Sequence, residues 1–222
     1  MIIAFDTSTA YTGVALYRED GLLAECNWRA HRDQTTQLLP MTQKLLDSQN
    51  LKPDTITGVA VALGPGSFNG LRVGVSTAKG MALALGLPLY GVSSLDMLAY
   101  QHSYLNGNLC TIIEAGRGRL GIGFYKVKNG KWNRQGDYEN VTASELATRI
   151  NAPTFIAGEL TVVQLQELES LTGKNAQILP AAASLRRAGY LAEMSWLRLK
   201  QGDMGEDIAD LQPIYLHQPV KQ

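Results

Sequence analysis

The sequence has few of the residues that build metal centres and disulfide frameworks. Its 222 residues include 2 cysteines and 3 histidines. Cys26 and Cys110 lack metal-ligand spacing, and so small a number of cysteines is typical of a protein from a reducing cytosol. His31, His102 and His217 form neither an H-x-x-x-H nor an H-E-x-x-H pattern. We therefore expect no histidine-based metal site.

Long apolar runs and an excess of charge are also missing. No apolar segment approaches the ~18 residues that a membrane-spanning helix needs, and residues 1–6 lack the basic start of a signal peptide. The 20 Lys+Arg balance the 20 Asp+Glu, which argues against a polybasic nucleic-acid-binding chain while leaving room for a local patch. We expect a cytoplasmic globular protein, long enough for one large domain or two small lobes.

A glycine-rich segment, residues 63–72, organises the first half of the chain. The apolar residues 57–63 predict a buried strand before it, and residues 71–85 predict a helix after it. Ser67 is placed to cap that helix. Such a turn can bind an anion with free backbone amides, or it can only set the angle of the helix. Its pattern matches neither G-x-x-x-x-G-K-[ST] nor G-x-G-x-x-G.

Small residues recur along the helix that follows. Gly70, Gly74, Ala78 and Ala82 lie four residues apart and form one ridge. Since glycine inside a helix costs roughly 0.5–1 kcal/mol relative to alanine, two glycines indicate that something approaches the helix closely. The approaching group is either the chain's own sheet or a helix of another subunit.

The order of predicted elements occurs twice. Residues 1–103 predict three meandering strands, then two more strands joined by helices, including an amphipathic helix over 35–50 with Pro40 in its first turn. Residues 104–222 repeat the order in shorter form, with a Thr142–Glu145 capping box and a last helix from Ser184 to about residue 200. We expect an α/β fold of two like lobes, 1–103 and 104–222, whose C-terminal helix and tail could pack back on the first lobe.

Two acidic residues end the corresponding first strands of these lobes, Asp6 and Glu114. Asp6 either braces its loop or holds a metal or a water near a nucleotide phosphate. In a two-lobed phosphotransferase both acids would face the nucleotide cleft, yet no lysine or clear general base stands beside them. The residues alone thus leave open an ATP-binding phosphotransferase, a metallopeptidase and a subunit without catalytic activity of its own.

Four segments carry a resemblance to a known family: residues 3–8, 38–40, 64–74 and 213–216. Together they resemble the TsaB family, also called YeaZ. The resemblance implies an actin/hexokinase/Hsp70-like (ASKHA) two-lobed fold with a reduced second lobe. It also implies a non-catalytic scaffold or activating subunit, without a cofactor, for forming N6-threonylcarbamoyladenosine next to the anticodon of tRNAs that read codons beginning with adenosine. The implied partners are a metal-bearing TsaD-type catalytic paralogue, a TsaE-type ATPase, a second copy when the chain is alone, and tRNA through the complex.

The resemblance also implies site residues, all of them in two groups. The pairing surface comprises residues of the first two helices: Leu38, Leu39, Met41, Thr42, Leu45, Leu46, Gly70, Arg72, Gly74, Val75, Ala78, Lys79 and Ala82. A vestigial nucleotide cleft comprises Asp6, Thr7, Ser8 and Glu114. Gln34, Asn69 and the Glu114-Ala115-Gly116 segment depart from the family pattern, which weakens nucleotide binding in that cleft and leaves the helix surface largely intact.

Overall fold

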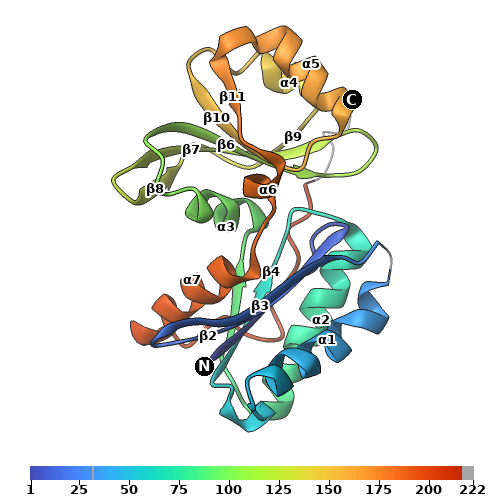
Figure 1. The fold of residues 1–222 in the computed structure, drawn as a ribbon, viewed down its shortest axis with the longest axis vertical. Helices are drawn as coiled ribbons and strands as arrows, with labels where there is room; N and C mark the ends of the chain where they lie inside the picture. Colours follow the sequence, from blue (N-terminus) through green and yellow to red (C-terminus); the bar gives the residue numbers. More distant parts are fainter. Residues whose placement is uncertain (32, 217–222) are drawn as a thin grey trace. The chain divides into compact units, whose positions relative to one another are not determined.

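A computed structural model describes residues 1–31 and 33–216, and it divides into two compact units (Figure 1). Unit 1 comprises residues 1–94 and 187–214, and unit 2 the described residues from 95–186 and 215–216. The last residues of the expected second lobe, 217–222, and with them His217, lie outside the described part of the chain.

Unit 1 is a five-stranded sheet in the order β3-β2-β1-β4-β5. In chain order its elements are β1 (Ile2–Asp6), β2 (Tyr11–Arg18), β3 (Gly21–Arg29), α1 (Gln34–Ser48), η1 (Pro53–Thr55), β4 (Gly58–Ala62), α2 (Phe68–Leu85), β5 (Leu89–Val92) and α7 (Ala188–Lys200). β2 runs antiparallel to β1 and β3, whereas β4 runs parallel to β1 and β5. Every residue of β1 and β4 is buried, as expected for central strands covered on both faces.

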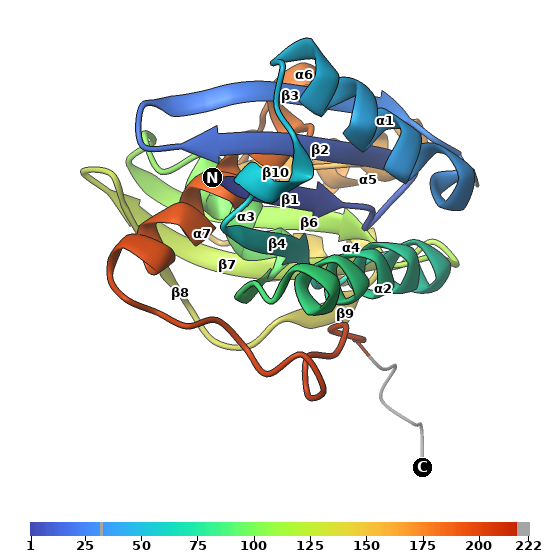
Figure 2. The same cartoon turned by 90° about the horizontal axis from the view of Figure 1, so that it is seen from below.

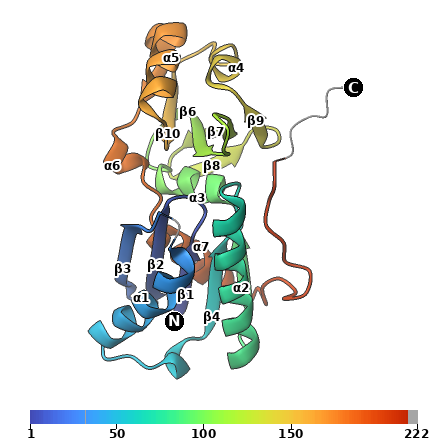
Figure 3. The same cartoon turned by 90° about the vertical axis from the view of Figure 1, so that its right-hand side faces the viewer.

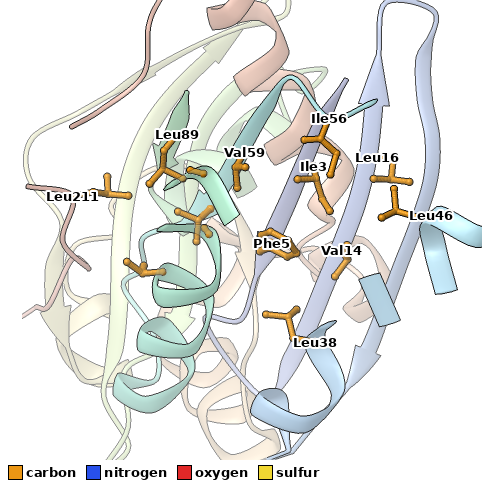
Figure 4. Packing of buried hydrophobic residues seen from close by; sticks show 14 residues of the cluster. Ile3, Phe5, Val14, Leu16, Leu38, Leu46, Ile56, Val59, Leu89 and Leu211 are labelled. Atoms are coloured by element: carbon orange, nitrogen blue, oxygen red, sulfur yellow. The ribbon is translucent and has the colours of Figure 1, made fainter. Parts of the chain in front are cut away.

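Helices cover the two faces of this sheet. α1 and α2 pack on one face and α7 on the other (Figure 3). Side chains from β1, β2, β4, α1 and α2 form one apolar core, which includes Ile3, Phe5 and Leu38 (Figure 4). α1 begins at Gln34, so Pro40 lies in its second turn and not in the first turn as expected.

Unit 2 repeats the strand order of unit 1 and adds one strand. Its sheet runs β11-β10-β6-β7-β8, and β9 pairs with β7. In chain order its elements are α3 (Ser94–Gln101), β6 (Gly107–Glu114), β7 (Leu120–Lys128), β8 (Lys131–Arg134), β9 (Glu139–Val141), α4 (Ala143–Ala147), β10 (Thr154–Gly158), α5 (Val162–Thr172), η2 (Gly173–Asn175), β11 (Ala176–Ile178) and α6 (Ala181–Ser184). The antiparallel β6–β7 pair and the parallel β6–β10–β11 set match β1–β2 and β1–β4–β5, which is the repeat that the sequence predicts.

The units divide at residue 94, and not near residue 103. α3 packs with unit 2, because Leu98 and Ala99 join the apolar cluster of β6 and β7. Only its first residue, Ser94, belongs to unit 1. The Tyr125 hydroxyl also donates a 2.8 Å hydrogen bond to Asp96. Ser184 does not cap the last helix as expected. It is the last residue of α6, and α7 begins at Ala188 because Leu185 and Arg187 adopt extended backbone between the two helices.

The segment after α7 runs along the outer strand of unit 1. Figure 2 shows it, in red, leading from α7 towards α2. Glu206 forms a β-bridge with Leu89 and accepts a 2.8 Å hydrogen bond from the Gly91 amide. Leu211 reaches the core, and the Ile214 amide donates to the Leu63 carbonyl at 2.7 Å. The tail therefore closes the β5 edge of the sheet, which would otherwise present unpaired backbone groups.

Candidate functional site

The glycine turn between β4 and α2 is held by backbone hydrogen bonds on both sides. The Leu63 amide donates to Val92 at 2.8 Å, and the Ser94 amide donates to Gly64 at 2.8 Å. The peptide bond between Gly64 and Pro65 is cis, and Gly64 has a φ of 98°, a conformation open to glycine. Ser67 caps α2 as expected, accepting from the Gly70 amide.

Three glycines of this turn and helix let the β1–β2 loop approach. A Cβ on Gly66 would lie 2.2 Å from the Ser8 carbonyl oxygen, and one on Gly70 would lie 2.2 Å from the Thr7 carbonyl oxygen. A Cβ on Gly74 would lie 2.3 Å from Thr7 Oγ1. The ridge of small residues therefore faces the chain's own first loop and sheet.

The polar groups of the β1–β2 loop are used inside unit 1. The Thr7 hydroxyl donates to the Gly70 carbonyl at 2.7 Å, and the Ser8 amide donates to Asp6 Oδ1 at 2.8 Å. The hydroxyls of Ser8 and Ser94 lie 2.6 Å apart in a hydrogen bond. Asp6, Thr7 and Ser8 are all buried. Hydrogen bonds and close packing against α2 thus hold the loop in place, and its hydroxyls do not point into solvent.

Sequence reasoning missed two side chains that complete this arrangement. Gln34 is buried at the start of α1, and its side-chain amide donates to the Thr9 carbonyl at 3.0 Å. Ser94 is fully buried and reaches Ser8 across 86 positions in sequence. The only sequence signal at Gln34 is its departure from the family pattern. Nothing in the sequence around Ser94 indicates a contact with residue 8.

The residues of the predicted pairing surface differ in their exposure. Most are buried within unit 1, and their contact with a partner stays a prediction; the buried ones are Leu38, Thr42, Leu46, Gly70, Gly74, Val75, Ala78 and Ala82. Met41, Leu45 and Lys79 are half-buried, and Lys79 donates to the Ala209 carbonyl of the tail. Leu39 and Arg72 are exposed. The amphipathic pattern of α1 marks its core face, so the exposed side chains between those positions are the ones open to a partner.

An exposed surface remains on these two helices, and we call it the outer face: Leu39, Arg72, Ser76, Gly80 and Leu83. Leu39 is 54% exposed and Leu83 is 73% exposed. The Arg72 guanidinium lies over the Phe68 ring, 5.2 Å from its centroid. A Cβ on Gly80 would meet nothing within 4 Å. The outer face therefore combines apolar side chains, one cation and the exposed backbone of Gly80.

The remaining predicted site residue, Glu114, is exposed at the end of β6 in unit 2. Asp6 belongs to unit 1, so the expectation that both carboxylates face one cleft stays a prediction. Within residues 1–31 and 33–216, no three His, Cys, Asp or Glu side chains come together in a way that could hold a metal ion. No helix in the same residues is long and apolar enough to cross a membrane.

Two sheets of one topology, each with flanking helices, define the actin/hexokinase/Hsp70-like class of two-lobed α/β proteins. Ethanolamine utilization protein EutJ from Carboxydothermus hydrogenoformans has this fold in common with the chain, with a TM-score of 0.52 at 14% identity over 86% of this chain and 88% of that one. This likeness concerns the fold alone.

Closer comparisons identify the family. The family model described as "TsaD: tRNA N6-adenosine threonylcarbamoyltransferase" matches residues 28–216. The tRNA threonylcarbamoyladenosine biosynthesis protein TsaB of Bacillus subtilis is 32% identical over 86% of this chain and 85% of its own length. YeaZ from Pseudomonas aeruginosa superposes with a TM-score of 0.81 at 26% identity, covering 97% of this chain and 99% of that one. The chain belongs to the TsaB (YeaZ) family.

Proposed function

We propose that this chain is a non-catalytic subunit for forming N6-threonylcarbamoyladenosine in tRNA, acting next to the anticodon of tRNAs that read codons beginning with adenosine. Its similarity to a Bacillus protein named for the biosynthesis of tRNA threonylcarbamoyladenosine supports the pathway. The catalytic partner would be a TsaD-type paralogue, joined by a TsaE-type ATPase, in the cytoplasm. Alone, the chain would form a homodimer through the surface that otherwise meets the paralogue.

The packed β1–β2 loop is the observation that carries the non-catalytic assignment. A nucleotide phosphate needs free donors, and here the Ser8 amide and the Thr7 hydroxyl already donate to Asp6 and Gly70. Burying a charged phosphate among groups that are already paired would cost several kcal/mol unless those bonds break. This loop therefore favours a structural subunit over a phosphotransferase.

The outer face of α1 and α2 supports the pairing half of the proposal. Large apolar side chains that are exposed on a lone protein are candidates for a surface that a partner covers. Leu39 and Leu83 provide apolar area, and Arg72 provides a cation of the kind enriched at energetically important interface positions.

The test is co-purification of the chain with the TsaD-type paralogue of its own organism. We expect Leu39→Asp with Leu83→Asp to weaken the complex by about 30-fold or more, the loss typical of an interface hot spot. The matched control is Val163→Asp with Leu171→Asp, which places two aspartates at apolar positions 72% and 56% exposed on α5. A complex unaffected by the first pair would reject the outer face, and wild-type chain that forms no complex would reject the proposed function.

A second readout is the modified nucleoside itself. Cells that lack this chain should lose threonylcarbamoyladenosine from their tRNA, and the control variant should restore it while the outer-face variant should not. ATP turnover by the isolated chain would instead favour the phosphotransferase.

A further inference from the structure

Positive charge is concentrated in one segment of this electrically balanced chain. Residues 115–136 contain none of the 20 acidic residues of the protein. They contain six of its 20 basic residues: Arg117, Arg119, Lys126, Lys128, Lys131 and Arg134. A run of 22 residues with that imbalance gives one region of unit 2 a strong positive potential although the net charge is zero.

Three of these cations share one face of the β7–β8 hairpin. Lys128 pairs directly opposite Lys131, and Lys126 pairs opposite Asn133. Directly opposed residues of an antiparallel pair point to the same side, and all four of these are exposed. We call them the lysine face. The intervening Val127 and Trp132 pack on the other side, in the cluster with Tyr125. In Figure 1 the hairpin carrying this face projects from unit 2 on the side away from α4 and α5.

The lysines of this face have no ion-pair partner in the part of the chain that the structure describes. Across residues 1–31 and 33–216 none of the three forms an ion pair, whereas Arg119 bonds to Asn140 and Glu145, and the Arg134 guanidinium lies 4.4 Å from the Tyr138 ring centroid. Like charges placed directly opposite in a hairpin are destabilising. Lys128 and Lys131 thus form a repulsive pair next to the turn, and a bound polyanion would relieve the repulsion.

We propose that the lysine face binds the phosphate backbone of RNA. The inference deepens the proposed function, on which it rests, by giving this chain a direct contact with the tRNA substrate. Lysines bind phosphates as point charges without reading sequence. Asn133 supplies a neutral donor beside them of the kind that contacts phosphate and sugar oxygens. An anionic membrane is a poorer fit, because an interfacial surface needs exposed apolar side chains among its cations, and Trp132 faces the opposite side of the hairpin.

The experiment measures binding of fluorescently labelled bulk tRNA to the full chain at several salt concentrations. We expect wild-type affinity to fall steeply with salt because binding releases counterions. Lys128→Glu with Lys131→Glu should weaken binding roughly tenfold at low salt and lower the log–log salt slope by about 2, one for each phosphate contact. The matched control, Lys52→Glu with Lys174→Glu, changes the net charge equally at two exposed positions away from this hairpin and should bind within twofold of wild type.

A single variant separates binding from folding. Lys128→Glu replaces the repulsive pair with a Glu–Lys pair across the hairpin, so its melting temperature should equal or exceed that of the wild type while its affinity for tRNA falls. Equal losses in the lysine-face and control variants, or no binding of tRNA by the wild type, would overturn the inference. Preferential binding to phosphatidylserine vesicles over tRNA would overturn it in favour of a membrane.

Failure of this inference can be told from failure of the proposed function. The lysine-face variant should still co-purify with the TsaD-type paralogue, because its substitutions lie in unit 2 and the outer face lies in unit 1. A chain that binds tRNA through the lysine face but never pairs with the paralogue would retain this inference and reject the proposed function.

Discussion

Thr7 and Gly74 occupy the same small space: a Cβ on Gly74 would lie 2.3 Å from Thr7 Oγ1, while that hydroxyl donates to Gly70 one turn earlier. The glycine is therefore needed where the first loop rests on α2. Alanine normally stabilises a helix interior by roughly 0.5–1 kcal/mol relative to glycine. Here the added methyl group would have to displace a fully buried hydroxyl that is held by its own hydrogen bond.

Gly74→Ala should therefore destabilise the protein by about 1–3 kcal/mol, the usual cost of overpacking a tight core. The matched control is Gly80→Ala in the same helix, where nothing lies within 4 Å of the new Cβ; it should stabilise by roughly 0.5–1 kcal/mol. Urea unfolding of both variants measures the two effects. Equal shifts of the same sign would mean that Thr7 does not press on Gly74. Gly74→Leu is unsuitable for testing whether α2 binds a partner, because its larger side chain would disrupt the fold and any loss of binding could follow from that.

Glu206 should hold the tail against β5. Its carboxylate accepts from the Gly91 amide at 2.8 Å and forms an ion pair with Arg198 at 2.9 Å. Glu206→Ala leaves the amide without its partner, at a cost of about 1–3 kcal/mol. Asp210→Ala removes an exposed acid from the same tail and should stay within about 0.5 kcal/mol of wild type. Faster proteolysis of the tail in the Glu206 variant alone would show that Glu206 holds the tail on β5. Equal cleavage of the tail in both variants would contradict this role.

The pH dependence of stability should include a contribution from His102. Burial in unit 2 lowers the pKa of this imidazole below its usual value of 6.5, since the charged form would lose its hydration. The unfolded chain then binds the proton more readily, so the contribution of His102 is complete above about pH 6.5 and is lost as the pH falls below that value.

Thermal melts between pH 8 and pH 5 would measure this loss, which should be smaller in His102→Gln. The exposed His31 provides the comparison: His31→Gln should follow the wild-type curve. A His102 variant with an unchanged pH profile would contradict the assignment.

Arg186 and Glu159 form an ion pair at the end of β10, with only 1% of the arginine side chain exposed. Glu159→Ala would leave a buried guanidinium without this partner and should cost about 3–5 kcal/mol. Arg186→Met combined with Glu159→Ala removes both charges and should recover much of that loss. Chemical denaturation of Glu159→Ala, Arg186→Met and the double variant measures the coupling between the two residues, and additive losses would show that the pair contributes little.

Local signals in the sequence predicted local structure well. Ser67 caps α2, the Thr142–Glu145 capping box opens α4, and both lobes have the repeated strand order. The two caps depend on residues a few positions apart, and the repeat on the order of the elements along the chain. The spacing of Gly70 and Gly74 likewise showed that they share a face of the helix, yet it held no information on what that face meets. Thr7, which settles the question, lies more than 60 positions away.

Contacts between distant segments account for the other differences. α3 follows β5 directly in the chain, yet its apolar side chains fit the cluster of unit 2, so adjacency in sequence gave the wrong boundary. The exposed leucine at 83 lies in the apolar run 81–85 at the end of α2, where composition cannot separate a core position from a partner surface. Both outcomes depend on tertiary packing, which outweighs local pattern.

The return of α7 to the first sheet sets the order in which the protein can fold during synthesis. β1 and β2 leave the ribosome long before α7, because the helix that covers one of their faces is made only after residue 187. The helices and strands that pack in unit 2 lie within residues 94–186, so all of them are made before then. The sheet of unit 1 is therefore made before the elements of unit 2 but covered after them, and its apolar face needs protection from aggregation until α7 has been translated.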